Sequence, residues 1–324
     1  MQASPCISII IPVYNTAAWL ERCLTCVFSQ TFQDWEIIAV DDGSTYNSLD
    51  VLKERAQQET RLHVYTQTNH GPAAARKKGL DNAVGQTILF IDSDDTFPPE
   101  YCALLWQAYE QTRAELVLAN VQTEGQPDER ASLFSHARVL KGSEKSLVFD
   151  NFPATMALYG KLIARELIAR IEFPSEVLKN GEDIFPSVQL IGEADKIALV
   201  PQARYEYRMR KNSQSRSAAN LFAGLFDGFL RARRYLEQRN PVLLESFEYV
   251  RRVVLTSFME KYGLTDAEEK LVRTHVKEVW VPRGCFKNRP WKFRLRQWVF
   301  ALSLQTGFSY SRFMRTLRGL THRG

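Results

Sequence analysis

The chain has 324 residues, which is long enough for one large α/β domain with additions or for two domains. With 45% hydrophobic and 24% charged residues it has a globular composition, which excludes a chain that is disordered throughout. The net charge of +5 is uneven, because ten of the 42 Lys and Arg residues, but none of the 37 Asp and Glu residues, lie between 279 and 324.

Short apolar runs alternate with helical patterns along the first third of the chain. Strands are predicted over 6–11, 35–40, 62–66, 87–91 and 115–121, with helical patterns between them. One helix is expected over 48–58, and another opens near Pro72, because proline suits the first turn of a helix. Such alternation favours the α/β fold class, with a mostly parallel sheet flanked by helices.

The rest of the chain is less regular. Residues 122–140 are predicted to form a polar loop or excursion, a mixed region follows to about residue 217, and a helix-rich segment runs from about 220 to 278. No run approaches the roughly 20 apolar residues of a membrane-spanning helix, and no secretory signal pattern is visible. The five cysteines lack the spacing of a disulfide framework, and the C-x-x-C pair of Cys23 and Cys26 has no second pair or His cluster to complete a zinc site. We therefore expect packing residues with reduced thiols and a cytoplasmic protein.

Polar residues gather where the predicted strands end. They are Pro12, Tyr14 and Asn15 after the first strand, Asp41 and Asp42 after the second, Asn69 and Gly71 after the third, and Asp92, Ser93, Asp94 and Asp95 after the fourth. Ligands of open parallel sheets bind at the carboxyl ends of the strands, so we expect these groups to converge on one crevice. The alternative interpretation is that they are solvated turns only.

Several carboxylates at one crevice repel one another and also repel an anionic ligand. A hard divalent cation resolves this conflict, since Mg²⁺ uses one or two carboxylates together with substrate phosphates, and Mn²⁺ accepts the same ligands. The pattern therefore predicts a Mn²⁺ or Mg²⁺ bridge to a diphosphate. The glycine-rich signatures of P-loop and nicotinamide-binding proteins are missing from the chain.

Four segments in order resemble the family 2 inverting glycosyltransferases of GT-A fold. They are I-S-I-I-I-P-V-Y-N, Q-T-F-Q-D-W-E-I-I-A-V-D-D-G-S-T, N-H-G-P-A-A-A-R-K-K-G-L and I-L-F-I-D-S-D-D. Weaker matches at 159–162, 181–184 and 205–213 extend the resemblance to about residue 217. It implies a GT-A domain over 1–217, with a nucleotide-sugar half at about 1–121 and an acceptor half at about 141–217. A helical C-terminal region, 218–324, ends in a basic aromatic tail.

The resemblance implies a donor site. Pro12 and Tyr14 line the nucleotide pocket, Asp41 accepts a hydrogen bond from a uracil ring with Asp42 beside it, and Arg76 lies near the nucleotide or its phosphates. The same donor site includes Asn15, Asn69, Gly71 and Ser93.

It also implies the metal and the base. Asp94 holds the metal as the last member of the D-x-D pattern, and Asp92 contacts the ribose or the metal. Asp183 matches the family's catalytic base, with Glu182 as the next candidate. One base without an evident second nucleophile suits a single displacement with inversion.

Other matching positions carry alternatives. Arg208 and Ser213 fall in a loop that closes on the diphosphate in relatives, although Arg208 also fits a solvated strand edge. Arg76 also fits a cation on a helix surface. Glu182 and Asp183 follow an Asn-Gly turn, so they also fit helix-capping residues.

The expected function is transfer of a sugar from a nucleotide-sugar donor, specifically a UDP-sugar, to a hydroxyl of a glycan or lipid-linked acceptor. Synthesis of bacterial-type surface polysaccharide or lipopolysaccharide is the expected setting. A nucleotidyltransferase is the first alternative, but it would be expected to use a glycine-rich basic loop where 12–16 offers none. A non-catalytic sugar-nucleotide-binding relative is the second, and the presence of Asp94 and Asp183 argues against it.

The tail from 283 to 324 interleaves Arg and Lys with aromatic residues. Interfacial helices often carry cations on one face and aromatic residues on the other, and basic clusters are attracted to anionic lipids. We therefore expect peripheral contact with the inner face of the cytoplasmic membrane. A helical segment packed on the catalytic domain is the alternative, and nucleic acid is not expected as a partner because no recognised motif accompanies the charge.

Overall fold

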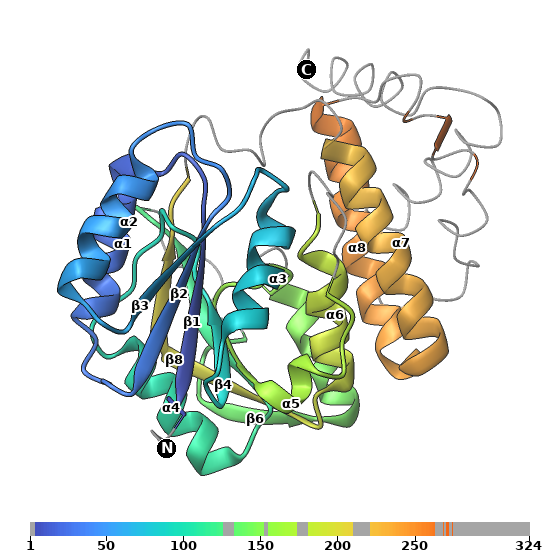
Figure 1. Ribbon diagram of the computed structural model, residues 1–324. Helices are drawn as coiled ribbons and strands as arrows, with labels where there is room; N and C mark the ends of the chain where they lie inside the picture. The colour runs from blue at the N-terminus through green and yellow to red at the C-terminus, as the bar shows by residue number, and fades with distance from the viewer. Residues whose placement is uncertain are drawn as a thin grey trace.

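The computed structural model describes residues 4–125, 133–151, 155–173, 181–209 and 221–262, together with positions 268, 270, 271 and 274. Within these ranges one sheet has the strand order β3-β2-β1-β4-β7-β5-β8-β6, and helices lie against both of its faces (Figure 1). The predicted α/β class, with a mostly parallel sheet and a helical C-terminal region, is confirmed.

The strands are β1 (Ile7–Val13), β2 (Trp35–Asp41), β3 (Leu62–Thr66), β4 (Thr87–Phe90), β5 (Leu116–Thr123), β6 (Arg138–Lys141), β7 (Lys161–Ala164) and β8 (Lys196–Tyr207). The helices are α1 (Ala17–Phe28), α2 (Ser48–Gln58), α3 (Pro72–Asn82), α4 (Tyr101–Thr112), α5 (Arg165–Ile168), α6 (Ile184–Glu193), α7 (Leu221–Arg239) and α8 (Pro241–Tyr262), and a 3₁₀ segment, η1, spans Gly142–Asn151. The helix over 48–58 and the five early strands lie where they are predicted, within two residues at each end.

The region predicted as a polar loop, 122–140, is the main local difference. β5 continues to Thr123, and β6 begins at Arg138 and pairs antiparallel with β8. β6 has only four residues, with a charged residue at each end, so its sequence shows no alternation of apolar and polar residues. Its formation depends on pairing with β8, which is distant in the sequence. Residues 126–132 lie outside the described ranges.

Strand direction places the loops that matter at one edge of the sheet. β1 pairs parallel with both β2 and β4, so the segments that follow these strands leave the sheet on the same side. β7 runs antiparallel between β4 and β5, and β5 and β8 are again parallel to each other. The parallel half is thus built from local crossovers, and the other half depends on an inserted strand.

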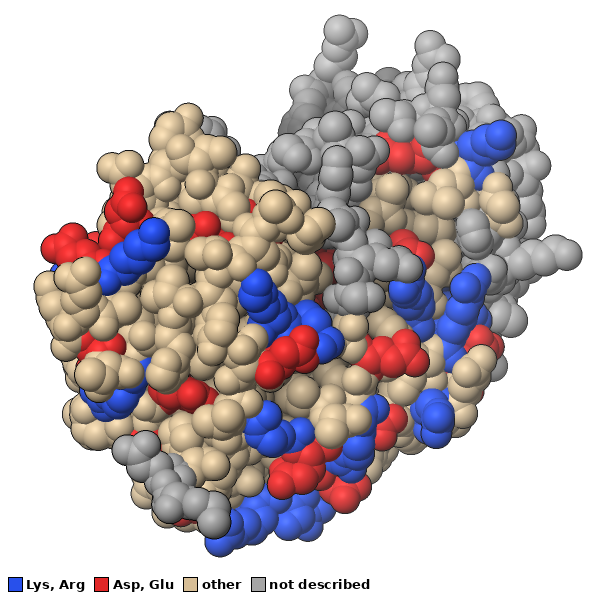
Figure 2. All heavy atoms as spheres, viewed as in Figure 1, with Lys and Arg blue, Asp and Glu red and all other residues tan. Residues whose placement is uncertain are grey.

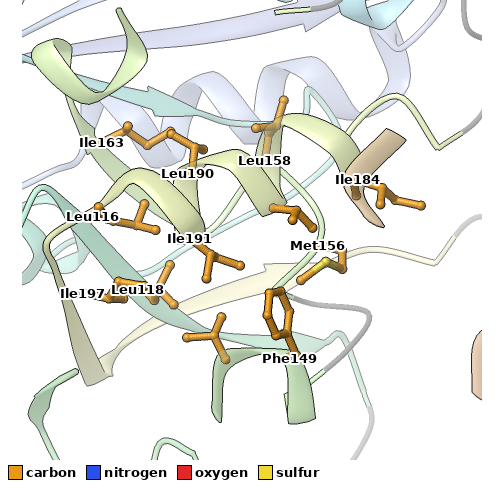
Figure 3. Close-up of a cluster of buried hydrophobic side chains, with 14 of the residues drawn as sticks. Leu116, Leu118, Phe149, Met156, Leu158, Ile163, Ile184, Leu190, Ile191 and Ile197 are labelled. Carbon is orange, nitrogen blue, oxygen red and sulfur yellow. The ribbon is translucent and has the colours of Figure 1, made fainter. Parts of the chain in front are cut away.

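Alternate residues of the strands enter two separate cores. In β1, Ile10 faces α3, α6 and α7, while Ile9 and Ile11 face α1 and α4. Each fully buried aliphatic side chain stabilises the fold by about 1.5–3 kcal/mol. Figure 3 shows the first core around α6, whose Leu190 and Ile191 lie over the side chains that β5 and β7 direct to this face.

The C-terminal helices form an antiparallel pair outside α6. α7 packs against both α6 and α8, and α8 also contacts η1. None of the described helices is long and apolar enough to cross a bilayer. On the face drawn in Figure 2, basic and acidic side chains are intermingled over the described residues.

Candidate active site

The loops after β1 and β2 hold each other through polar side chains. Asn15 adopts a left-handed backbone conformation with φ 52°, and its Oδ1 accepts a hydrogen bond of 2.9 Å from the backbone of Thr45. Asn15 N donates in turn to Ser44 Oγ at 3.0 Å. Asparagine tolerates this conformation better than most residues, so Asn15 can join the loops after β1 and β2.

Asp41 and Asp42 are adjacent but have different surroundings. Asp42 Oδ1 and Oδ2 accept hydrogen bonds from the backbone of His70 and Gly71, at 2.9 and 2.8 Å, which fixes the loop that precedes α3. Asp41 Oδ2 accepts from Ser44 N at 3.2 Å, but its Oδ1 is buried and has no hydrogen-bond partner. A buried carboxylate oxygen without a donor is costly, so Asp41 is the acceptor that a ligand would satisfy.

The D-S-D-D turn after β4 has two inward members. Ser93 donates to Thr16 Oγ1 at 2.9 Å. Asp95 is fully buried and accepts hydrogen bonds from the Tyr205 hydroxyl and from Arg208 N, both at 2.8 Å. Asp92 and Asp94 are both partly exposed, and Asp92 accepts a hydrogen bond from Arg76.

Arg76 connects the two halves of the site. An added Cβ at Gly79 would lie 2.3 Å from Ile10 Cγ2, so α3 lies close on β1 and Arg76 is 3% exposed. Its guanidinium donates to Asp183 Oδ1 at 2.7 Å and to Asp92 Oδ1 at 2.9 Å, and it lies 3.4 Å from Glu182 Oε1. The alternative of a surface cation is therefore wrong. Its expected place near the nucleotide or its phosphates stays a prediction.

The turn before α6 presents Glu182 and Asp183 to this guanidinium. Asp183 is the N-cap residue of α6 by position, yet its side chain makes no capping hydrogen bond. Its carboxylate is used by Arg76 instead, so the helix-capping interpretation does not describe its contacts. Through Arg76, Glu182 and Asp183 are joined to Asp92 in the turn after β4.

The pKa of the Asp183 carboxyl is raised to about 7, chiefly by burial; Arg76 and Lys161 oppose the shift, and the charges of Glu182 and Asp92 add to it. Burial disfavours the charge of Arg76 as well, but Asp183, Asp92 and Glu182 outweigh it and raise the Arg76 pKa. A carboxylate whose pKa is near neutral is suited to accept a proton in a reaction at physiological pH.

Lys161 is a member of this site for which the sequence pattern indicated no role. It lies in β7, is 1% exposed, and its Nζ donates to the carbonyl of Ala157. Burial lowers the Lys161 pKa to about 7, and the negative charge of Asp183 opposes that shift. A lysine inside an otherwise apolar strand, K-L-I-A, is the signal that could have identified it.

The two positions predicted in the closing loop differ in outcome. Arg208 donates through Nη2 to Glu124 Oε1 at 2.9 Å, and Glu124 also binds Arg22 at 3.1 Å. Arg208 is thus ion-paired with the segment that follows β5, and its expected contact with the diphosphate stays a prediction. Ser213 lies outside the described residues.

The chain is similar to proteins of known family and structure. Residues 8–167 match the family described as glycosyl transferase family 2. The chain belongs to glycosyl transferase family 2. The matched segment contains β1 to β7, and with them Asp41, Arg76, Asp92 and Asp94.

Two curated relatives are each similar over about two thirds of the chain. GlyA of Streptococcus pneumoniae is 30% identical over 224 residues, and EpsH of Bacillus subtilis, a putative glycosyltransferase, is 32% identical over 218 residues. Each match covers 65% of this chain, but only 31% of GlyA and 62% of EpsH. The chain therefore spans less than two thirds of the length of either relative.

A solved structure is similar over nearly the whole chain. TarS of S. aureus, residues 1–349 in complex with UDP-GlcNAc, superimposes with a TM-score of 0.80 at 20% identity, covering 97% of this chain and 91% of that one. The agreement shows the family fold and includes the helical C-terminal region, which lies beyond the family match.

The turn after β4 offers carboxylate oxygens to a metal ion. Within the described ranges no three acidic, His or Cys side chains are grouped as a ready metal site. After β4, Asp92 and Asp94 are partly exposed while Asp95 is buried, and Arg76 binds one oxygen of Asp92. Two carboxylates fit Mg²⁺ or Mn²⁺ when phosphate oxygens complete the coordination, so the residues fit a metal that arrives with its nucleotide.

Proposed function

We propose that the chain is a metal-dependent inverting glycosyltransferase that moves a sugar from a UDP-sugar to a hydroxyl of a glycan or lipid-linked acceptor. One observation carries the proposal. Arg76 brings Asp183, the candidate base, into one site with Asp92, which follows the strand at the donor edge. An acceptor oxygen beside Asp183 would then lie close to a sugar whose diphosphate is held near Asp92 and Asp94.

The chemistry follows from these positions. Asp183 accepts the proton of the acceptor hydroxyl as its oxygen attacks the anomeric carbon, and the bond from that carbon to the diphosphate oxygen breaks. General-base catalysis of this kind contributes about 10²–10⁴-fold. Asp94 and Asp92 would hold the cation, which when bound neutralises charge on the leaving diphosphate. Attack opposite the leaving group inverts the anomeric configuration.

A uracil nucleotide is the donor that best suits Asp41. Its buried Oδ1 lacks a partner, and uracil carries a ring N–H that could donate to it. TarS, a structural neighbour, has been solved with UDP-GlcNAc and with UDP. Pro12, Tyr14, Asn69 and Ser93 remain our assignment for the rest of the donor pocket.

Release of UDP from a panel of UDP-sugars, measured with Mn²⁺, with Mg²⁺ and with EDTA, tests the proposal. We expect UDP release that depends on the metal and on one sugar. Calorimetry with UDP should show binding that EDTA weakens strongly. Preference for GDP or CMP would refute the donor assignment, and release of pyrophosphate instead of UDP would indicate a nucleotidyltransferase.

The acceptor and the cellular site are proposed on composition. The basic aromatic tail from 283 lies outside the described residues, and its ten cations without carboxylates suit an anionic membrane surface. A lipid-linked acceptor of surface polysaccharide or lipopolysaccharide synthesis would be available there. Flotation with anionic liposomes, comparing the full chain with a truncation at Val279, should show binding that the truncation and added salt both abolish. Equal flotation of both proteins would contradict it.

A further inference from the structure

The turn that presents Glu182 and Asp183 lies directly against the backbone of α7. Gly181, with φ +76°, has no room for a side chain, because an added Cβ would lie 2.9 Å from the carbonyl oxygen of Gly224. In the other direction, an added Cβ at Gly228 would lie 2.7 Å from the Gly181 carbonyl oxygen. Gly224 and Gly228 are four residues apart, so they share one face of α7. Backbone meets backbone at this contact.

The same helix follows α6 to its far end. An added Cβ at Gly192 would lie 2.8 Å from the Tyr235 hydroxyl, which donates to Glu193 Oε1 at 2.6 Å. The opposite face of α6 packs on the sheet through Leu190 and Ile191 (Figure 3). α6 is therefore held between the sheet and α7 along its whole length.

The contact between α7 and Gly181 involves a carbonyl that also accepts the first hydrogen bond at the start of α6. The Gly181 carbonyl, which α7 touches, accepts from Ile184 N at 3.2 Å, and Ser187 N donates to the Asp183 carbonyl at 3.0 Å. On the other side, Arg76 binds the Asp183 carboxylate at 2.7 Å. The base thus lies between a guanidinium from α3 and a glycine face of α7.

We infer that α7 is a positioning element of the active site, and that its Gly224–Gly228 face sets where the Asp183 carboxylate stands. The inference rests on the proposed function, because it concerns the base of that reaction. It gives the helical C-terminal region, which lies beyond the family match, a part in the chemistry. The donor loops, which follow β1, β2 and β4, do not depend on this contact.

Gly228→Ala tests the inference by adding one methyl group against the Gly181 carbonyl. We expect kcat for sugar transfer to fall about 10-fold or more, because a small displacement of a reacting group strongly lowers the rate of the reaction. The Kd for UDP with Mn²⁺ should not change. Gly192→Ala is the matched control, since it adds the same methyl to the α6–α7 contact at the end away from the base. Its kcat should stay within about twofold of the parent, because distant sites act independently.

Amide hydrogen exchange at Ile184 supplies a readout that needs no substrate. Exchange should be faster in Gly228→Ala and unchanged in Gly192→Ala. If Gly228→Ala does not fold, Phe226→Leu removes buried volume from the same stretch of α7 and should change kcat and Ile184 exchange in the same directions. Parent values of both in the folded variant, or equal losses in Gly228→Ala and Gly192→Ala, would overturn the inference. A parent protein that releases UDP from no donor would refute the proposed function instead, while the exchange comparison would still decide the contact.

Discussion

The side of the site that we assign to the donor, here the donor side, and the side that we assign to the base, here the base side, are built in different ways. On the donor side, each polar group directly follows a parallel strand, and loops a few residues long fix it, as Asp42 does with the backbone of Gly71. On the base side, Asp183 reaches the site through β7, α6 and α7, which meet only when the whole domain has packed. Local geometry therefore positions the donor, whereas long-range packing positions the base. Substitutions on the two sides should separate binding from chemistry.

The largest effect is expected on the donor side, at Asp94. Asp94→Ala removes a carboxylate assigned to the metal, so both metal-dependent UDP binding and sugar transfer should be lost. Calorimetry with UDP and Mn²⁺ should give the weak binding that the parent shows in EDTA. Tight UDP binding that does not depend on metal, in either protein, would contradict the role given to Asp94.

Asp183→Asn should affect the base side alone. The amide keeps the size of the side chain but removes its basicity, so transfer should fall by roughly 10²-fold or more. The Kd for UDP should stay within a few-fold, because Asp183 is assigned to the acceptor. Glu182→Gln is the matched control. An inactive Glu182→Gln with an active Asp183→Asn would move the base by one residue, and circular dichroism would detect unfolding of either variant.

Arg76 contacts residues of both sides, so its substitution should affect the donor side and the base side together. Arg76→Met leaves three carboxylates without their shared cation, and breaking a buried ion pair of this kind costs about 3 kcal/mol once the partial exposure of the carboxylates is considered. Arg76→Lys keeps the charge but cannot bind several carboxylates at once, so it should recover only part of that stability. Urea unfolding measures both variants, and parental stability of Arg76→Met would show that the carboxylates do not need it.

The sequence predicted the donor side of the site more completely than the base side. Apolar runs and the turns that end them predicted β1 to β4 and the polar residues after them, because each signal is local. The resemblance placed Asp183, but no pattern indicated that its neighbours would be Arg76 and Lys161, since those contacts join distant segments. The structural role of Asp95, bound by the Tyr205 hydroxyl, was missed for the same reason. β6 is too short to be read without its partner, β8.

A smaller, more selective effect is expected at Asp41. Asp41→Asn can keep an acceptor for Ser44 N while its amide nitrogen turns toward the nucleotide base. That nitrogen would oppose the ring N–H of uracil but could donate to the corresponding ring nitrogen of cytosine. Loss of a hydrogen bond to a charged group costs about 1.5–3 kcal/mol, so UDP affinity should fall roughly 10-fold or more. The ratio of UDP to CDP affinity should fall further, and an unchanged ratio would remove Asp41 from base recognition.

The smallest effect is expected at Lys161. Its substitution should change the pKa of the base, Asp183, without changing donor binding, so it separates the two sides most clearly. Transfer requires the ionised form of Asp183, whose pKa is raised to about 7, so activity should increase as pH rises through about 7. The positive charge of Lys161 opposes that shift, and Lys161→Met removes it, so the acidic limb should move to higher pH. The move should be modest, because burial lowers the Lys161 pKa to about 7 and the side chain loses charge over the same range.

Stability separates this electrostatic role from a structural one. An apolar side chain of similar volume at a buried lysine is often neutral or stabilising, so Lys161→Met should unfold at the same urea concentration as the parent or a higher one. Donor binding should stay constant between pH 6 and 8 in both proteins. An unshifted limb in a stable Lys161→Met would mean that Arg76 alone keeps Asp183 ionised. A limb that moves to lower pH would contradict the sign of the interaction between Lys161 and Asp183.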